Sequence, residues 1–326
     1  MNLNQLRYIR EVVRRGLNVS AAAEALYTSQ PGVSKQIRQL EDELGLQIFV
    51  RSGKQFTHVT PAGQEIIAEA EKILLKVQNI RAIAQDYRDE NSGSLSIATT
   101  HTQARHALPE VVAAFRQHHP RISLHMHQGT PMQIADMAAR GEVDFAIATE
   151  SMELFEDLVT LPCYRWNRSV VVPKDHPLTE VEPLTLQAIA SYPIVTYVFG
   201  FTGRSKLDKA FERQKLEPQV IFTATDSEVI KTYVELGLGI GIIASMSFDA
   251  ARDQNLTVLD ASHLFDDSIT NIGFRRGTYL RGYMREFMTL FAPHLSAEVI
   301  DRANAVRTAD ERSALYKELE PQLQRR

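Results

Sequence analysis

The chain has 326 residues, of which 44% are hydrophobic, and a formal net charge of −4. This length exceeds that of one typical core, so we expect two or three domains. No apolar run reaches the roughly 18 residues of a membrane span, and the start of the chain reads as an amphipathic helix rather than a secretory leader, so we expect a cytoplasmic protein with no membrane partner. The single cysteine, Cys163, excludes an intrachain disulfide and a cysteine-rich metal site, and we expect it to be a packed small hydrophobe.

Charge is unevenly distributed along the chain. Residues 1–60 contain eight Lys and Arg against five Asp and Glu, a formal charge of +3, which leaves −7 for the remainder. A cationic first domain on an acidic body is typical of a protein that contacts nucleic acid at one end only.

Three helices are predicted in the first 45 residues. The apolar stripe of the first is formed by Leu3, Leu6, Ile9 and Val13. Asn18 or Ser20 caps the second helix, which Tyr27-Thr28-Ser29 interrupts. Pro31 is tolerated only in a first turn, so the third helix begins near Gln30. Its expected buried side is Val33, Ile37, Leu40 and Leu44. The second and third helices together predict a helix-turn-helix.

Polar and cationic side chains project from the amino-terminal half of the third helix. We predict that the DNA-contacting residues there are Ser29, Gln30, Pro31, Ser34, Lys35 and Arg38. Hydroxyl, amide and guanidinium groups bind base edges or phosphates. The acidic Glu41, Asp42 and Glu43 crowd the other end and would repel the DNA backbone, so we expect the helix start to point inward. Taken alone, the pair also fits two surface helices of an ordinary bundle.

A short hairpin is predicted after the helix pair. Two apolar runs, 49–51 and 56–59, flank Ser52-Gly53-Lys54-Gln55, which places Arg51 and Lys54 near the tip of a wing. A basic wing beside a basic helix favours DNA binding over an ordinary helical bundle.

A long helix is predicted from Pro61, with Thr60 as its cap, to about residue 90. Its apolar residues are spaced alternately by four and three: Ile66, Ala70, Ile73, Val77, Ile80, Ala84 and Tyr87. A narrow seven-residue stripe is typical of paired helices, although a helix that lies on its own domain is the alternative.

Beyond Asn91-Ser92-Gly93, strands and helices alternate. The expected strands are 95–100, 122–126, 144–148, 169–172, 194–197, 219–223, 239–244 and 271–275. Helices between them are expected at 103–118, 132–140, 184–190, 204–215 and 226–236, followed by one at 279–291. This order predicts two α/β lobes with parallel strands around a cleft.

Hydroxyl groups follow several of these strands. Thr99 to Gln103, Thr149 and Gly200 to Ser205 stand where strands end or helices begin, and free amides with hydroxyls at such positions bind anions. We therefore expect a small carboxylate or sulfate, held by neutral donors without a full cationic partner. For any single threonine, a helix cap is the alternative.

The chain resembles the LysR-type transcriptional regulators. The resemblance rests on AAEAL, SQPGVSKQIRQLEDELG, Phe49 with Arg51, and Thr60-Pro61-Ala62-Gly63, and extends over nearly the whole chain. It implies an α/β protein with residues 1–60 as a winged helix-turn-helix, 61–90 as a dimerising linker helix and 91–295 as a two-lobed effector domain like the periplasmic binding proteins. Lobe 1 is expected at 91–163 and 269–295, lobe 2 at 164–268, and a helical tail at 296–326. Double-stranded promoter DNA, a small anionic effector and a homodimer or homotetramer are the implied partners.

Within the family the motifs are most similar to the regulator of cysteine biosynthesis, and a sister regulator of alkanesulfonate utilisation is the alternative. Motifs such as FVRSGK, IATTHTQARHALPEV and FGFTGRS carry this similarity. It implies an inducer pocket that accepts N-acetylserine, can hold sulfate, and is formed by Thr100, Thr102, Gln103, Thr149 and Thr202. Trp166 is an apolar wall of this cleft or, equally, a core residue.

Metal binding and catalysis are not expected. His125 and His127 share a strand face, but no acidic or thiol partner stands at ligand spacing. No GxSxG, Walker or GxGxxG run occurs, so we expect neither an enzyme nor a cofactor. A small-anion binding protein without DNA function is the remaining alternative, and it leaves the first 90 residues unexplained.

Overall fold

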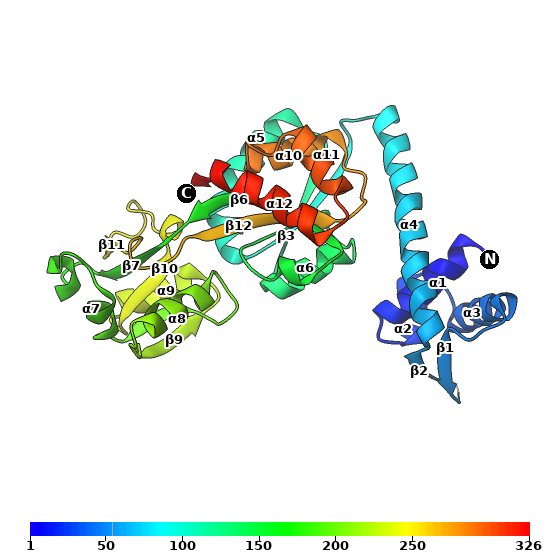
Figure 1. The fold of residues 1–326 in the computed structure, drawn as a ribbon, viewed down its shortest axis with the longest axis horizontal. Helices are drawn as coiled ribbons and strands as arrows, with labels where there is room; N and C mark the ends of the chain where they lie inside the picture. The colour runs from blue at the N-terminus through cyan, green and yellow to red at the C-terminus, as the bar shows by residue number, and fades with distance from the viewer. Residues whose placement is uncertain (54) are drawn as a thin grey trace. The chain divides into compact units, whose positions relative to one another are not determined.

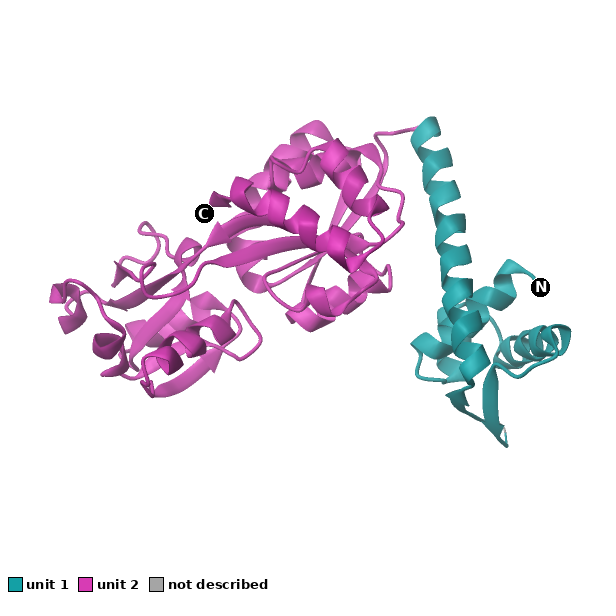
Figure 2. Cartoon of the chain, viewed as in Figure 1, with its two compact units in different colours: residues 1–88 teal, residues 89–326 magenta. Residues whose placement is uncertain are grey.

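The computed structural model describes residues 1–53 and 55–326, and the chain forms two compact units. Unit 1 comprises Met1–Arg88 and unit 2 comprises Asp89–Arg326 (Figure 2). Each unit buries its own hydrophobic residues in a core of its own.

Unit 1 is a helix-turn-helix with a two-stranded wing. Its elements are α1 (Leu3–Arg14), α2 (Val19–Ala25), α3 (Gln30–Leu44), β1 (Phe49–Ser52), β2 (Gln55–Val59) and α4 (Pro61–Arg88) (Figure 1). The side-chain oxygen of Asn18 accepts a hydrogen bond from the Ala21 amide at 3.0 Å, and Ser29 Oγ accepts one from the Gly32 amide at 3.2 Å. These contacts confirm both expected helix starts.

The core of unit 1 follows the predicted stripes except at the helix ends. Val33, Ile37 and Leu40 are fully buried, whereas Leu3 and Leu44 are 40% and 39% exposed. The prediction for these two residues was wrong because each is the terminal residue of its helix, where the neighbouring turn that would cover it is missing.

The long helix α4 is anchored at its start and uncovered at its end. Thr60 Oγ1 accepts a hydrogen bond from the Gly63 amide at 2.9 Å and donates one to the Gln47 carbonyl at 2.7 Å. Ala70 and the neighbouring Leu74 are buried in the unit 1 core, whereas Ile80 is 66% exposed. The seven-residue stripe therefore divides: its first part packs on its own domain and its second part remains exposed.

Lobe 1 of unit 2 is built on a six-stranded sheet of order β13-β6-β12-β5-β3-β4. These strands are β3 (Gly93–Thr99), β4 (Ile122–Gln128), β5 (Phe145–Ala148), β6 (Leu158–Trp166), β12 (Ser268–Arg275) and β13 (Gln324–Arg325). The helices of this lobe are α5 (Leu108–His118), α6 (Pro131–Ala139), α10 (Gly282–Phe291), α11 (Ala297–Ala305) and α12 (Ala309–Leu319). Ile97 and Ala98, adjacent on β3, belong to two different apolar clusters, so both faces of the sheet are covered. β3 pairs in parallel with β4 and β5, as predicted.

Lobe 2 is built on a five-stranded sheet of order β11-β7-β10-β8-β9. Its elements are β7 (Arg168–Pro173), α7 (Leu186–Ala190), β8 (Ile194–Tyr197), α8 (Arg204–Arg213), β9 (Val220–Ala224), α9 (Ser227–Glu235), β10 (Ile240–Ala244) and β11 (Leu256–Asp260). Short helical turns in unit 2 are η1 (Gln103–Ala107), η2 (Met152–Leu154), η3 (Pro177–Glu180), η4 (Ser245–Ser247) and η5 (Glu320–Gln322). The expected parallel arrangement holds for β8 with β9 and β10. It was wrong for the strands next to the lobe crossings, because β7 pairs antiparallel with β10 and β11, and β12 pairs antiparallel with β5 and β6.

The chain crosses between the lobes twice, at Asn167 and over residues 261–267. β6 continues to Trp166, so the first crossing lies three residues beyond the expected start of lobe 2. β6 and β11 were not among the predicted strands. β6 contains Pro162, which lies opposite Asn271 where the register with β12 shifts, and a proline is tolerated in a sheet at such an irregularity.

The carboxyl-terminal segment packs into lobe 1 rather than forming a separate body. Leu315 and Leu319 of α12 are buried in the lobe 1 core, and β13 pairs in parallel with β6. Arg165 on β6 forms an ion pair with Glu320 at 3.1 Å. Among the described residues, none of the helices combines the length and the hydrophobicity needed to cross a bilayer.

Candidate DNA-reading surface and effector site

The predicted reading residues of α3 lie on the surface of unit 1. Ser29, Gln30, Pro31, Lys35 and Arg38 are exposed and Ser34 is half-buried. Gln30 Nε2 donates to Ser34 Oγ at 3.4 Å, so these two side chains support one another. Within the described part of the chain, Lys35 and Arg38 form no ion pair, so both cations are available to phosphates and base edges.

The wing contributes less free charge than the sequence predicted. Arg51 forms an ion pair with Glu41 and lies 5.2 Å from the centre of the Phe56 ring, so its guanidinium is held by unit 1 itself. Lys54, the other predicted wing residue, lies outside the described residues. Spacing alone gave Arg51 a place near the wing tip but did not show that a buried carboxylate faces it.

Glu41 is the residue that joins α3 to the wing. It is only 5% exposed, and its Oε1 accepts hydrogen bonds from the backbone amides of Ile48 at 2.9 Å and Phe49 at 3.1 Å. A carboxylate with three donors can be buried because its hydrogen-bonding capacity is used. Glu41 therefore fixes the start of β1 relative to the end of α3, rather than lying exposed among the acids at the helix end.

In lobe 1, the predicted effector residues follow β3 directly. Thr100, Thr102 and Gln103 are buried, and Gln103 begins the π-helical turn η1. The Tyr164 hydroxyl donates to Gln103 Oε1, and Gln103 Nε2 donates to Thr270 Oγ1 at 3.2 Å. Burial raises the pKa of Tyr164, which keeps its phenol protonated as a donor. A π-turn within a helix often marks a functional site.

Thr102 is the residue of this group that faces lobe 2. Its Oγ1 is buried and meets the geometry of a hydrogen bond with none of the described residues, although the Tyr197 hydroxyl is near enough to interact with it. Tyr197, at the end of β8, is buried, and its hydroxyl accepts a hydrogen bond from the Ala244 amide at 3.2 Å. A buried hydroxyl without a partner is costly, which favours a ligand or water at this position.

Thr202 lies in the loop between β8 and α8, in a strained conformation. Its φ is 48°, a value that residues with a side chain rarely adopt, and it is 7% exposed. The next residue, Gly203, has a φ of 68°, and a side chain there would overlap the Arg168 guanidinium. Strained backbone of this kind is often found at ligand sites.

Arg168 is a candidate site residue that the sequence reasoning missed. Its side chain is 1% exposed, and its Nη2 donates to the carbonyl oxygens of Thr202 at 3.2 Å and Gly203 at 2.6 Å. Its Nη1 is buried without a partner, and among the described residues no carboxylate forms an ion pair with it. Burial lowers the pKa of Arg168 to about 10, so the guanidinium stays charged at neutral pH. An unpaired buried cation favours an anionic ligand.

Trp166 is a core residue. Its side chain is fully buried in the main apolar cluster of lobe 1, with Nε1 unpartnered, and its ring lies 5.3 Å from the Arg168 guanidinium carbon. The tryptophan therefore packs beside Arg168. Of its two expected roles, the packing agrees with that of a core residue.

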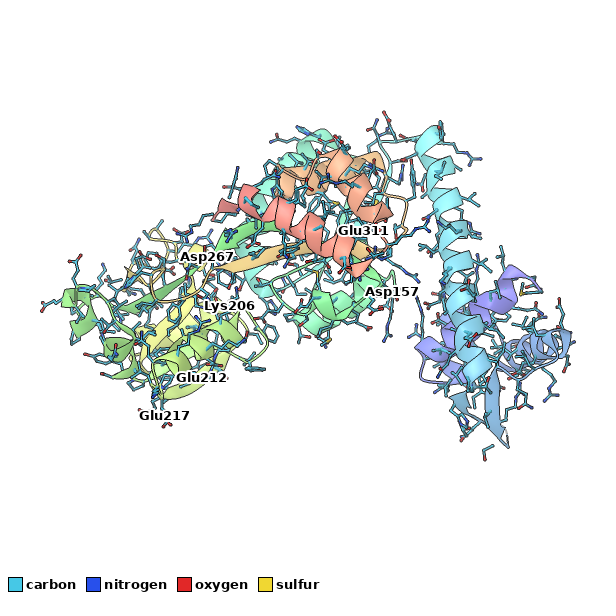
Figure 3. All side chains as sticks on the ribbon, in the orientation of Figure 1. Asp157, Lys206, Glu212, Glu217, Asp267 and Glu311 are labelled. Carbon is cyan, nitrogen blue, oxygen red and sulfur yellow. The ribbon has the colours of Figure 1, made fainter. Side chains whose placement is uncertain are left out.

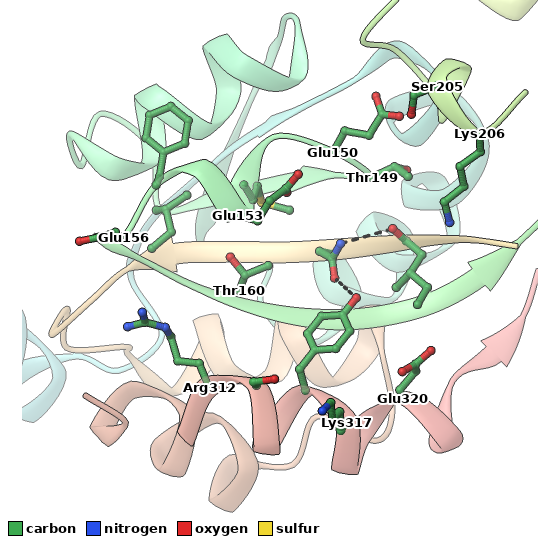
Figure 4. Close-up of a pocket in the computed structure, with 17 residues that line it drawn as sticks. Thr149, Glu150, Glu153, Glu156, Thr160, Ser205, Lys206, Arg312, Lys317 and Glu320 are labelled. Carbon is green, nitrogen blue, oxygen red and sulfur yellow. Dashed lines mark hydrogen bonds between the residues drawn. The ribbon is translucent and has the colours of Figure 1, made fainter. Parts of the chain in front are cut away.

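Thr149 lines a cavity of about 790 Å³ between lobe 1, α12 and the start of α8 (Figure 4). From lobe 2, Ser205 and Lys206 line the same cavity. Thr100, Thr102, Gln103, Thr202 and Trp166 are not among its lining residues. Thr149 therefore borders this cavity, and the other predicted residues are buried.

A polar contact joins the lobes next to the buried group. Arg105 of η1 forms an ion pair with Glu228 of α9 at 3.0 Å, and His106 Nε2 lies 3.5 Å from Ser227 Oγ. Burial lowers the pKa of His106 below its ordinary value, although Glu228 opposes this effect. Because these contacts are partly exposed, each of them stabilises this arrangement of the lobes only weakly.

Histidines outside the cleft have partners of their own. His118 and His119 both contact Glu286, at 2.6 and 2.9 Å, whereas His125 and His127 lie exposed on β4. No cluster of three or more metal-ligating side chains occurs among the described residues. Cys163 is buried in the lobe 1 core, as predicted, and burial raises its pKa.

Two family descriptions match the chain. "Bacterial regulatory helix-turn-helix protein, lysR family" matches residues 3–64, and "LysR substrate binding domain" matches residues 88–296. The "HTH-type transcriptional regulator CysB" of Haemophilus influenzae is 53% identical over 98% of this chain and 99% of its own length. "SsuR" of Burkholderia cenocepacia is 50% identical over 91% of this chain and 96% of its own, and "cbl" of Escherichia coli is 47% identical over 93% and 96%.

Solved structures show the same architecture. The cofactor-binding domain of the Cbl transcriptional regulator aligns with a TM-score of 0.63 and 48% identity over 65% of this chain and 92% of that one. Full-length OxyR from Pseudomonas aeruginosa aligns with a TM-score of 0.67 over 90% of this chain and 94% of that one, at 24% identity, and shows a shared fold.

Proposed function

Because the chain belongs to the LysR family of bacterial transcriptional regulators, we propose that it regulates sulfur-assimilation and cysteine-biosynthesis genes in response to N-acetylserine. Members of this family are DNA-binding regulators and not enzymes. In this proposal α3 binds promoter DNA and the junction between the lobes of unit 2 binds the effector. The similarity to CysB along nearly the whole chain supports the choice of genes.

One observation carries the effector part of the proposal. The buried Arg168 guanidinium holds the Thr202 and Gly203 carbonyls but has no acidic partner of its own. A small carboxylate at the lobe junction would supply the missing negative charge, while Thr102 offers a free hydroxyl. N-acetylserine carries one carboxylate and an uncharged acetamide, which fits a site of one cation and neutral donors, and sulfate fits the same groups.

Coupling between the two units requires that the effector favour one arrangement of the lobes or subunits over another. The effector residues come from both lobes, and Arg168 lies directly after the Asn167 crossing. An effector that draws Thr202 toward Gln103 would therefore change the angle between the lobes. In a dimer or tetramer joined through α4, that change alters the spacing of two reading heads on a two-fold operator.

A gel-shift on sulfur-gene promoters with and without N-acetylserine tests this proposal. We expect a change in promoter affinity or complex mobility with N-acetylserine for the wild type, and no change for Gln103→Ala. Promoter binding that is insensitive to N-acetylserine in the wild type would contradict the proposal.

Regulation of alkanesulfonate utilisation is the second candidate. SsuR and cbl relatives match this chain at 50% and 47% identity, not far below the 53% of the CysB relative. The same gel-shift distinguishes the two: N-acetylserine-dependent binding to cysteine-gene promoters supports the first, and preferential binding to sulfonate-gene promoters supports the second.

A further inference from the structure

Two adjacent arginines at strand β13 contact lobe 1 beside the effector residues. Gln324 of β13 lies opposite Tyr164 of β6. Arg326 follows β13, and its amide donates to the Arg165 carbonyl at 2.9 Å, so the pairing continues beyond the strand itself. Since successive residues of a strand point to opposite faces of the sheet, the side chains of Arg325 and Arg326 reach two different places.

Arg326 packs on the tyrosine that holds Gln103. Its guanidinium carbon lies 4.7 Å from the centre of the Tyr164 ring, which is a cation–π distance. The Tyr164 hydroxyl donates to Gln103 Oε1. Arg326 Nη1 also donates to the Ala107 carbonyl at 3.2 Å, at the end of the π-turn that Gln103 begins. Arg326 therefore contacts both the partner of Gln103 and the last residue of its turn.

Arg325 binds the place where the chain crosses between the lobes. Its Nη2 donates to the two carboxylate oxygens of Asp267, at 2.9 and 2.8 Å. Asp267 belongs to the second crossing, and its Oδ1 also accepts a hydrogen bond from Asn167, in the first crossing, at 2.8 Å. Lys206 of α8 donates to the Asp267 carbonyl (Figure 3). Asp267 thus links β13 to both crossings and to lobe 2.

The two arginines are not part of the packing that holds their own segment. Leu315 and Leu319 of α12 are buried in the lobe 1 core, and Glu320 forms an ion pair with Arg165 at 3.1 Å. Both arginines of the β13 segment are exposed, so each stabilises the lobe only weakly. Their contacts fall instead on the effector residues and on the crossings about which the lobes turn.

We propose that Arg325 and Arg326 are positioning residues for the effector junction. Arg326 holds the Tyr164 ring and the π-turn, so the Gln103 side chain is already oriented when the effector arrives, and a pre-oriented group loses less entropy on binding. Arg325 holds the two crossings together, so effector binding produces one defined lobe angle. This role rests on the proposed function, because it concerns the same effector site, and it gives the carboxyl-terminal segment a part in the effector response.

A double-mutant cycle on the full chain, measured by calorimetry with N-acetylserine, tests the role of Arg326. We expect Arg326→Gln to weaken N-acetylserine binding about fivefold in the wild type, but less than about twofold in Tyr164→Phe, where the hydroxyl that orients Gln103 is already absent. The matched control is Arg302→Gln, which removes an ion pair with Glu318 in the same segment and should leave the affinity unchanged. Equal affinity in Arg326→Gln and the wild type, or additive losses in the cycle, would overturn the role of Arg326.

Arg325→Gln tests the hold on the crossings. The variant should bind N-acetylserine within about twofold of the wild type, because its contacts do not reach Gln103. The change in promoter affinity caused by N-acetylserine should fall to about half or less, because the crossings are no longer held at one angle. A full wild-type response in Arg325→Gln would overturn the role of this arginine.

Hydrogen exchange of the unliganded full chain tests the positioning without N-acetylserine. Amides of η1 should exchange about fivefold faster in Arg326→Gln, and amides of residues 261–267 should do so in Arg325→Gln, while Arg302→Gln changes neither. Unchanged exchange in both arginine variants would overturn the proposal. Failure of the wild type to bind N-acetylserine would count against the proposed function alone, and the exchange measurement would then decide the positioning roles by itself.

Discussion

The reading surface of unit 1 and the effector junction of unit 2 use polar groups in opposite ways. Lys35 and Arg38 are exposed on a helix whose fold is complete without them, whereas Thr102, Gln103 and Arg168 are buried between elements that they help to hold. Exposed side chains contribute to DNA affinity with little effect on stability. The buried groups contribute both to ligand affinity and to folding stability. A substitution there therefore changes the two together.

The largest effect on stability and ligand affinity is expected from Arg168→Gln, which tests the buried polar groups of the effector junction. The variant removes the cation and most donors to the Thr202 and Gly203 carbonyls, so we expect unit 2 to lose about 2–4 kcal/mol of unfolding free energy. N-acetylserine affinity should fall at least about a hundredfold, which corresponds to about 2.7 kcal/mol.

Calorimetry and denaturant unfolding measure these two effects. Arg168→Lys is the control for charge: it keeps the cation, and it should retain more anion affinity than Arg168→Gln even where stability falls equally. Equal ligand affinity in the wild type and Arg168→Gln would show that the buried cation does not act on the effector.

Ile80→Asp tests the exposed end of α4. Ile80 is 66% exposed in the single chain, so the substitution should leave monomer stability nearly unchanged. A carboxylate in a helix–helix seam would cost about 2–3 kcal/mol in association, because it is buried there without a partner. Sedimentation velocity should show a smaller assembly. Glu69→Gln, on an exposed position of α4, is the control, and an unchanged sedimentation coefficient for Ile80→Asp would remove α4 as the dimer contact.

Glu41→Gln tests a buried group in unit 1, the unit whose reading residues are exposed. The substitution keeps the shape but removes the charge that binds two amides and Arg51, so we expect a loss of about 1–3 kcal/mol in unit 1. Promoter affinity should fall as the wing loses its attachment, while N-acetylserine affinity remains. Retention of wild-type promoter affinity and melting temperature would mean that Glu41 does not position the wing.

The smallest effect concerns pH and the contact between the lobes. Burial lowers the pKa of His106 below its ordinary value of 6.5, so protonation is less favourable in the folded than in the unfolded chain. The stability contributed by neutral His106 is therefore complete above pH 6.5 and declines as the pH falls below it. His106→Gln should reduce the acid-side loss of unit 2 stability by less than about 1 kcal/mol. Identical stability–pH profiles between pH 5 and 8 would contradict this assignment.

Much of the fold was predictable because it rests on local rules. Ser29 and Pro31 predicted the start of α3, and the alternate spacing of apolar residues by four and three predicted α4. The alternation of strands and helices predicted the two lobes. β6 was missed because Pro162 argues against a strand when the irregularity in its partner β12 is unknown. The tail was expected to be helical, with a role in packing or in contact with another subunit. Its packing site was not predictable because Leu315 and Leu319 reveal their burial only against a folded lobe.

In the candidate effector site, the sequence pointed to hydroxyl groups but not to a buried charge. Strand-end threonines indicated an anion, and neutral donors were thought sufficient. Arg168 was missed because it precedes the expected strand at 169–172, where an arginine is usually solvated, and because buried arginines are rare. Only the fold shows that both lobe crossings meet at this guanidinium, since Ser268 Oγ lies 3.4 Å from its Nη2. Arg51 lies near the wing tip as predicted, but its ion pair was not anticipated because its buried partner, Glu41, reads as a surface acid.

The most direct test of two separable binding surfaces is a paired measurement on Arg38→Ala and Gln103→Ala, with promoter anisotropy and N-acetylserine calorimetry on the same samples. We predict that Arg38→Ala weakens promoter binding about tenfold and leaves N-acetylserine affinity unchanged, and that Gln103→Ala does the reverse. Parallel loss of both activities in either folded variant would contradict the account.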